Sequence, residues 1–572
     1  MVVSNVFAVY APQVVRYAFD LVNETHEVFL LLNGFSLQQS LMNFFAKTAF
    51  LLGMLYILLA VFRGVFLFLM RQTLIVMSRH IEYDLKNEIF KHYESLSLSF
   101  YKKNNTGDLM NRISEDVSRV RMYLGPAIMY SINLIALFVL VITAMLTVNA
   151  KLTFYVLLPL PLLSIAIYLV SSVINKKSEK VQRQLSNLST YAQEAFSGIR
   201  VLKAYNREAF SVAEFNRESE IYKEKSMGLV KTNAMFFPFM MLLIGLSTLL
   251  TVFIGGMEVI AGHISVGNIA EFIIYVNLLT WPVAAVGWVT SIIQRAAASQ
   301  QRINEFLNTH SDISNPGGPP FEIKGKVAFK NVSFNFPGSE IKTLKNVSFT
   351  IEPGKTLAIV GKTGSGKSTV ANLITRLYDV TAGEVLVDGR NIREINLNSL
   401  RSCIGYVPQD VFLFSDSIAN NIAFGERVDD SDMELIENAA KNAAIYSNII
   451  EFPKGFQTML GERGITLSGG QKQRVSIARA IIKKPPILIF DDCFSAVDTE
   501  TEEEILNNLK RVIKQKSSII ISHRVSSVKH ADHIIVLENG EIIEEGNHQS
   551  LLEEKGTYFE LHQKQLLEEL KG

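Results

Sequence analysis

Cysteine and surplus charge are both scarce in this sequence. Its 572 residues include two cysteines and carry a formal net charge of only +1. Cys403 and Cys493 cannot build a disulfide framework, so the half of the chain that holds them suits a reducing compartment. A nearly balanced charge gives no reason to expect nucleic acid as a partner, because binding to phosphate backbones requires an excess of Lys and Arg.

Charged residues are sparse overall, at 19%, whereas hydrophobic residues make up 48% of the chain. This balance is more apolar than that of ordinary soluble domains and indicates a membrane protein. The chain is also too long for a single core, so at least two domains are expected. No charged segment precedes the first apolar run, and a cleavable signal peptide is therefore not expected.

Long apolar runs fill the first 310 residues. One such run could be a buried helix of a soluble protein, but several together indicate membrane spans, each needing roughly 20 residues. The five clear runs are Phe44–Met77, Pro126–Val148, Leu152–Val173, Ala234–Ile260 and Asn268–Ile293.

A sixth span is expected from Val2 to about Leu21, although Pro12 interrupts it. Without this span the two ends of the domain would lie on opposite sides of the membrane. It starts abruptly and is barely long enough to cross a bilayer. We therefore expect the natural polypeptide to begin upstream of Met1.

Basic residues are concentrated on one side of the predicted membrane. The stretches 79–121 and 175–231 are rich in Lys and Arg, whereas 20–43 and 258–268 contain neither. The positive-inside rule places the first pair in the cytosol and the second pair outside. Phe44–Met77 would measure roughly 50 Å as a helix at 1.5 Å per residue, so we expect the spans to continue into the cytosol.

The composition changes after residue 310. Residues 311–320 are rich in Pro, Gly and Ser and are predicted as a linker. Short β-branched strands then alternate with helical patterns through 321–572, which is typical of an α/β domain. The predicted fold is an α-helical six-span transmembrane domain, 1–310, followed by an α/β P-loop nucleotide-binding domain.

A glycine-rich loop follows the predicted buried strand 356–360 and precedes the helical pattern of 370–377. Strand, loop and helix in this order indicate a nucleotide-phosphate site, since glycines let the backbone N–H groups face an anion. Lys367 would neutralise phosphate charge and the Ser368 hydroxyl would bind Mg²⁺. The candidate ATP-binding residues of the loop are Gly361, Lys362, Thr363, Gly364, Ser365, Gly366, Lys367, Ser368 and Thr369.

Two further motifs lie downstream. The apolar strand 487–490 ends in Asp491 and Asp492, and a carboxylate at that place supports Mg²⁺ in nucleotide hydrolases. Between the two motifs a Ser-Gly-Gly turn precedes a helical pattern. It could be merely flexible, but its amides could also bind a second anion. The candidate residues there are Leu467, Ser468, Gly469, Gly470 and Gln471.

This ordered set of motifs resembles the ATP-binding cassette exporters that fuse membrane and nucleotide domains, and the resemblance covers nearly the whole chain. It implies ATP and Mg²⁺ as cofactors and Leu467–Gln471 as the signature motif. It also implies an adenine-stacking aromatic residue, a Q-loop residue near Mg²⁺, an X-loop, a D-loop and a switch histidine. These fall on Phe336, Gln409, 461–464, Ser495–Asp498 (with Asp498) and His523, respectively.

The resemblance extends to the membrane half. Segments 98–116 and 194–205 are similar to the two cytosolic coupling loops of these exporters. In the family, each ATP lies between the P-loop of one chain and the signature motif of another. The chain is therefore expected to be one half of a dimer in the cell membrane, with its nucleotide domain in the cytoplasm. Metal-binding roles are implied for Ser368, Gln409 and Asp491.

Asp492 departs from the family pattern, because hydrolysing members usually carry Glu there. The implied catalytic residues are Asp492, His523 and Gln409. An intact signature beside a shortened carboxylate favours a heterodimer, with homodimerisation as the alternative. The expected function is ATP-driven export of a hydrophobic or amphipathic drug, lipid or peptide. The alternative is an ATP-gated regulatory or non-transporting subunit.

Overall fold

The computed structural model describes residues 1–426, 432–461, 464, 466–495 and 499–569, apart from a few side chains inside helices, at positions 160, 163–164, 168, 236–237, 283–284, 499 and 568–569. The chain divides into two compact units. The first comprises Met1–Glu94 and Thr106–Thr309, and the second comprises Ser95–Asn105 together with the chain from His310 onward.

The first unit is entirely helical. Two of its segments, η1 and η2, are wide π-helical turns within an otherwise continuous helix. In chain order it contains α1 (Val2–Leu31), α2 (Leu37–Ser95), α4 (Thr106–Asn111), η1 (Arg112–Asp116), α5 (Val117–Met122), η2 (Tyr123–Ala127), α6 (Ile128–Val148), α7 (Ala150–Leu157), α8 (Pro159–Ser197), α9 (Ile199–Ala204), α10 (Glu208–Ile260) and α11 (Val266–Leu307).

Four helices in the described part of the chain are long and apolar enough to cross a membrane. They are Leu37–Ser95, Thr106–Val148, Glu208–Ile260 and Val266–Leu307, and they contain four of the five clear apolar runs. The fifth run is divided between α7 and α8 at Leu158, directly before Pro159. Proline has no backbone N–H, so it cannot continue the hydrogen bonding of the preceding helical turn.

Two helices are longer than their apolar runs. Helix α2 has 59 residues, which confirms that the run Phe44–Met77 continues well beyond a bilayer's thickness. Helix α1 extends to Leu31 and contains the expected span from Val2 to about Leu21. Polar side chains such as Glu24 outside the hydrocarbon core do not stop a helix.

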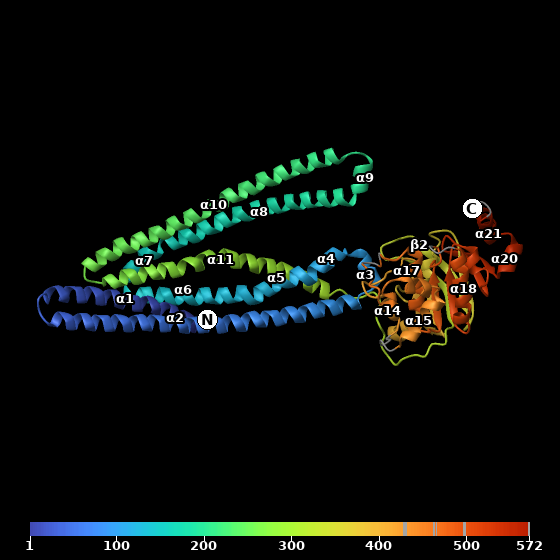
Figure 1. The fold of residues 1–572 in the computed structure, drawn as a ribbon, viewed down its shortest axis with the longest axis horizontal. Helices are drawn as coiled ribbons and strands as arrows, with labels where there is room; N and C mark the ends of the chain where they lie inside the picture. Colours follow the sequence, from blue (N-terminus) through green and yellow to red (C-terminus); the bar gives the residue numbers. More distant parts are fainter. Residues whose placement is uncertain (427–431, 462–463, 465, 496–498, 570–572) are drawn as a thin grey trace. The chain divides into compact units, whose positions relative to one another are not determined.

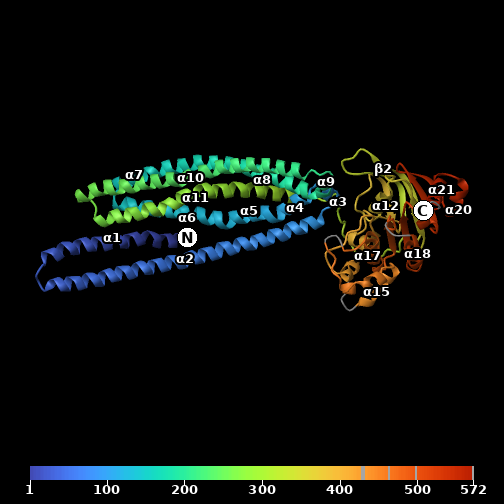
Figure 2. The ribbon, with the colours of Figure 1, turned by 45° about the horizontal axis from the view of Figure 1, so that its top comes forward.

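Helices α8 and α10 lie side by side, and the short α9 joins their ends (Figures 1 and 2). The core of the unit gathers residues of α6, α7, α10 and α11, with Val141, Leu152, Phe272 and Val276 fully buried. By contrast, α2 buries only Ser78 and Ile89 among its 59 residues. Most of its apolar surface is therefore not covered by the rest of this unit.

The second unit contains two sheets. One has the strand order β2-β1-β4-β5 and the other has the order β10-β9-β3-β8-β7-β6. The strands are β1 (Val327–Asn335), β2 (Lys342–Ile351), β3 (Thr356–Val360), β4 (Ala382–Val387), β5 (Arg390–Asn391), β6 (Ile404–Val407), β7 (Ile487–Asp491), β8 (Ser517–Ile521), β9 (His533–Glu538) and β10 (Glu541–Gly546).

In the larger sheet, β9, β3, β8, β7 and β6 run parallel and only β10 is antiparallel. The accompanying helices are α3 (Leu98–Lys103), α12 (Lys367–Ile374), α13 (Leu397–Ser402), α14 (Ile418–Ala423), α15 (Met433–Asn442), α16 (Tyr446–Glu451), α17 (Gly469–Ile482), α18 (Thr499–Ile513), α19 (Val525–Val528), α20 (His548–Glu554) and α21 (Thr557–Glu569).

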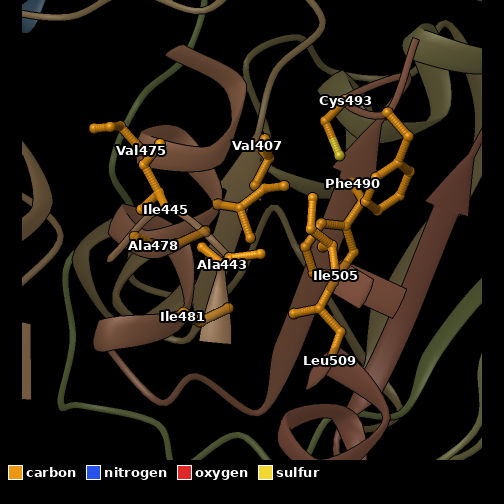
Figure 3. Packing of buried hydrophobic residues seen from close by; sticks show 14 of the residues in the cluster. Val407, Ala443, Ile445, Val475, Ala478, Ile481, Phe490, Cys493, Ile505 and Leu509 are labelled. Carbon is orange, nitrogen blue, oxygen red and sulfur yellow. The ribbon is translucent and has the colours of Figure 1, made fainter. Parts of the chain in front are cut away.

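Apolar side chains hold α17 and α18 to this sheet. Ala478 and Ile481 from α17 belong to the same cluster as Phe490 from β7 and Ile505 from α18, as Figure 3 shows. Every residue of β7 is buried. Strands covered on both faces are typical of parallel sheets. Because β7 is packed on both faces, its carboxyl end, where Asp491 and Asp492 lie, has a fixed position.

Candidate nucleotide site

The site lies at the carboxyl ends of four neighbouring parallel strands. The order β3-β8-β7-β6 brings together the segments that follow each strand. These are the glycine-rich loop after β3, His523 after β8, Asp491 and Asp492 at the end of β7, and Gln409 after β6. Ligands of open α/β sheets bind at such an edge, so the topology alone assembles most of the predicted residues.

The glycine-rich loop needs glycine for its backbone and for its close contacts. Gly361 and Gly366 have φ values of 153° and 102°. A Cβ at Gly361 would collide with the Leu537 carbonyl oxygen, and one at Gly366 would lie 2.7 Å from that of Thr343. The loop therefore curls tightly against β2 and β9, as a phosphate-binding loop requires.

Lys367 lies inside this curl and is only 6% exposed. Its Nζ donates hydrogen bonds to the carbonyls of Gly361 (2.8 Å) and Lys362 (2.9 Å). Burial lowers the pKa of Lys367 to about 8, although Asp492 and Asp491 act in the opposite direction. The nearby Ser365 Oγ is buried and has no hydrogen-bond partner. Both groups fit a site that receives an anion.

The two aspartates have separate partners. Ser368 Oγ donates to Asp491 Oδ1 at 2.8 Å, and the Tyr406 hydroxyl donates to Oδ2 at 3.5 Å. Gln409 Nε2 donates to Asp492 Oδ2 at 3.4 Å. Burial raises the pKa of the Asp491 carboxyl, and its hydrogen bond from Ser368 opposes that rise.

This donor set fits Mg²⁺. Hydroxyl, carboxylate and amide oxygens are the hard ligands that the ion prefers, and it usually binds few protein groups together with phosphates and waters. The described residues include no cluster of three or more His, Cys, Asp and Glu side chains. Ser368, Asp491 and Gln409, the three predicted metal residues, lie on this one strand edge.

His523 has Lys367 and Asp492 as its charged neighbours. Burial lowers the pKa of its imidazole, the Lys367 ammonium lowers it further, and Asp492 acts against both. A lowered pKa favours the neutral form of the ring. A neutral ring next to the loop can donate a hydrogen bond to an anion through one nitrogen.

Phe336 follows β1 and packs edge-on against two other rings. Its centroid lies 5.0 Å from that of Phe334 and 5.3 Å from that of Tyr378. The Lys102 ammonium from α3 lies 5.0 Å from the Phe336 centroid, within cation–π range. Sequence reasoning found Phe336 and placed α3 in a coupling loop, but it missed the contact between them.

Leu467–Gln471 forms the start of α17. Ser468 Oγ accepts from the Gln471 N–H, and Gln471 Oε1 accepts from the Ser468 N–H at 3.0 Å, which makes a capping box. Leu467 is buried in the adjoining cluster. These bonds fix the helix start but leave the amides of Gly469 and Gly470 pointing beyond it.

Two predicted motifs are only partly covered. Asp498, with residues 496–497 of the predicted D-loop, lies outside the described residues, as do residues 462–463 of the predicted X-loop. Ser495 is described, and its Oγ donates to the carbonyl of Asp492 at 3.0 Å. Gly464 donates its N–H to the Gly461 carbonyl at 2.8 Å.

Comparisons with known proteins agree with this geometry. The family model for the ABC transporter transmembrane region matches residues 2–283, and the ABC transporter model matches residues 344–495. A probable multidrug resistance ABC transporter ATP-binding/permease protein of Bacillus subtilis is 37% identical over 84% of this chain and 83% of its own length. The chain belongs to the ABC transporter family.

Two further relatives refine this membership. An ATP-dependent lipid A-core flippase of Syntrophus aciditrophicus is 36% identical over 86% of this chain and 81% of its own. A solved bacterial Atm1-family ABC exporter with ATP bound covers 98% of this chain and 99% of its own, with a TM-score of 0.75 and 27% identity. This ABC transporter is thus an exporter-type, ATP-driven translocase embedded in the membrane, with a cytoplasmic ATPase domain.

Proposed function

We propose that this chain is one half of a dimeric exporter that uses ATP to move a hydrophobic or amphipathic substrate across the membrane. The main observation in support is that one chain holds a phosphate-binding loop and a separate capped helix start. The hydrogen bonds of Ser468 and Gln471 remain within their own helix. The amides beyond them are therefore available to the ATP held by a second chain.

Each residue at the strand edge has a proposed role. Lys367 binds the β- and γ-phosphates, and Phe336 stacks on adenine. Asp492 polarises the attacking water, and His523 contacts the γ-phosphate. Ser368, Asp491 and Gln409 would hold Mg²⁺, which supplies charge neutralisation at the phosphates.

Closure of the dimer follows from differential binding. Gly469 and Gly470 of one chain reach the γ-phosphate only when the second chain's loop approaches, so ATP favours the closed state by the contacts made only there. The coupling segments, α3 and α9, would then transmit the change to the membrane helices. In the D-loop, Asp498 would act across the same interface.

The membrane unit offers a route for such a substrate. A groove of about 1190 Å³ lies along α10 and α11. Among the described residues that line it none is charged, and Met240, Phe253 and Trp281 give it a soft, apolar surface. Polar contacts are limited to residues such as Asn277 and Thr280. This chemistry suits an apolar or amphipathic molecule rather than an ion.

A different chain is the favoured partner. Asp492 is one methylene shorter than the usual Glu, and errors near 1 Å at a reacting centre can cost about a hundredfold in rate. In a homodimer both sites would carry this defect. In a heterodimer the intact signature of this chain would complete a competent site on its partner, while the site built on Asp492 would turn over slowly.

The decisive experiment expresses this chain alone and reconstitutes it in lipid vesicles. We expect weak ATPase activity that rises when Asp492→Glu is introduced or when the product of a neighbouring gene is added. Robust, cooperative activity from the chain alone, unchanged or lowered by Asp492→Glu, would establish the homodimer instead.

A regulatory or ATP-gated subunit is the second candidate, and Asp492 is the observation that favours it. The two functions differ in one measurement. An exporter couples ATP to directional flux of a fluorescent lipid or drug across vesicles, whereas a regulatory subunit binds ATP without flux. Flux that is absent with every partner tested, despite normal nucleotide binding, would favour the second function.

A further inference from the structure

The turn after β8 is held by a side chain from the far end of the chain. Gln565, on α21, donates its Nε2 to the His523 carbonyl at 2.6 Å. Its Oε1 accepts from the Val525 N–H at 2.7 Å. A single primary amide thus pairs with the backbone on both sides of Arg524, as a neighbouring strand would.

A second clamp reaches the same turn from α18. Glu502 is only 2% exposed and accepts hydrogen bonds from Arg524 Nη1 (2.8 Å) and from Ser527 Oγ. Ser522 Oγ accepts from the Arg524 N–H at 2.9 Å. The turn is therefore held from two helices: Gln565 of α21 bonds its backbone, and Glu502 of α18 bonds the side chains of Arg524 and Ser527.

The turn packs into the core through Val525 and Val528, but a pocket adjoins its other side. A cavity of about 270 Å³ lies among α18, α19 and α21, lined in part by Val525, His562 and Gln565. Close packing transmits position through contact, but a void cannot. On the side of this pocket, the amide of Gln565 holds the His523 carbonyl.

We propose that Gln565 is a positioning residue for His523, and that α21 thereby controls how fast the site hydrolyses ATP. The inference rests on the proposed role of His523 at the γ-phosphate. Gln565 does not touch the nucleotide loop. Its loss should therefore lower turnover by misplacing the imidazole and leave the ground-state affinity for ATP unchanged.

The test uses the full-length chain in lipid vesicles, together with whichever partner gives activity. We expect Gln565→Ala to lower kcat for ATP hydrolysis about tenfold, with KM within twofold of the wild type. Gln565→Glu is nearly isosteric and keeps the acceptor for Val525, but it places a carboxylate oxygen against the His523 carbonyl. We expect it to lower kcat at least as much, with little change in Tm.

Gln563→Ala is the matched control, since Gln563 is an exposed residue on the same helix. It should leave kcat unchanged. Wild-type kcat in both Gln565 variants, or an equal loss in Gln563→Ala, would overturn the proposal. If Gln565→Ala fails to fold, Gln565→Glu alone decides, because it preserves the volume of the side chain.

His523→Ala separates this inference from the proposed function. An inactive His523→Ala beside a fully active Gln565→Glu would remove the positioning role but keep His523 at the site. Full hydrolysis by His523→Ala would instead refute the role of the histidine, and with it the reason for the clamp.

Discussion

The two units of this protein differ in how far they bury their apolar residues. In the nucleotide unit all five residues of β7 are buried by the sheet and the helices around it. In the membrane unit α2 buries two of its 59 residues, while Phe50 and Leu51 are 69% and 65% exposed. The nucleotide unit buries this strand within its own core, whereas the membrane unit leaves an apolar surface on α2 that only lipid or a second chain can cover.

The buried polar side chains of the two units also have different partners. The nucleotide unit gathers its buried polar side chains, such as Lys367 and Asp491, at a strand edge that receives a ligand. The membrane unit instead pairs them internally. Glu271 is fully buried in α11 and binds Arg16, Asn268 and Tyr275. Buried charges thus line a ligand site in the nucleotide unit, which also holds the internal pair Glu502–Arg524, whereas Glu271 joins helices in the membrane unit. Four substitutions test these roles.

The largest expected effect is in the nucleotide site. Lys367→Ala should reduce ATP hydrolysis to background, because the loop loses the cation that its Gly361 and Lys362 carbonyls now hold. Steady-state phosphate release from purified protein measures this. Lys355→Ala is the matched control, since the Lys355 ammonium lies outside the loop and pairs with Asp532 at 2.8 Å. Full hydrolysis by the Lys367 variant would refute the site.

The second substitution breaks the buried pair of the membrane unit. Glu271→Ala leaves Arg16 without its carboxylate, 3.3 Å away, and should lower the free energy of unfolding by about 3 kcal/mol. Thermal unfolding in detergent checks this. Glu305→Ala, at an exposed position of the same helix, should change it by less than about 0.5 kcal/mol. Equal stabilities of the two variants would contradict the contrast drawn above.

The third substitution removes the adenine platform. Phe336→Ala should weaken ATP binding by about 1–3 kcal/mol, the range for loss of one base–aromatic stacking contact. Phe336→Tyr keeps a π face and should bind as the wild type does. Calorimetric titration with a non-hydrolysable ATP analogue measures both. An unchanged Kd for Phe336→Ala would show that adenine binds elsewhere.

The smallest effect concerns α3. The Lys102 ammonium lies over the Phe336 ring, so it competes with adenine for that face. Lys102→Ala should tighten ATP binding about two- to fivefold, as expected for an exposed cation–π contact of ~0.5–1 kcal/mol. Lys103→Ala, at the exposed neighbouring position, should have no effect. Weaker binding in the Lys102 variant would show that the ammonium supports adenine instead.

Local patterns explain why much of the site was predictable. Gly361–Thr369 and Asp491–Asp492 each follow a short buried strand directly, so strand periodicity and the next few residues were enough to place them. The parallel order β3-β8-β7-β6 then brings Gln409 and His523 to the same edge. Gln409 and His523 have no such local signal and were predicted from their resemblance to family motifs.

The missed residues have no such local signal. Lys102 meets Phe336, and Gln565 meets His523, across long separations in the chain. Each is an ordinary polar residue of a helix, and only the tertiary fold brings it into contact with a residue of the site.

The scarcity of cysteine has a practical consequence at the active site. Cys493 directly follows Asp492 and is fully buried, and burial raises the pKa of its thiol well above the usual value. Such a thiol is inert toward alkylating reagents, so Cys403, which is partly exposed, is the natural labelling position. A Cys403→Ser background therefore accepts spectroscopic probes at introduced cysteines, and the separation of α8 and α10 during turnover becomes measurable without disturbing Asp492.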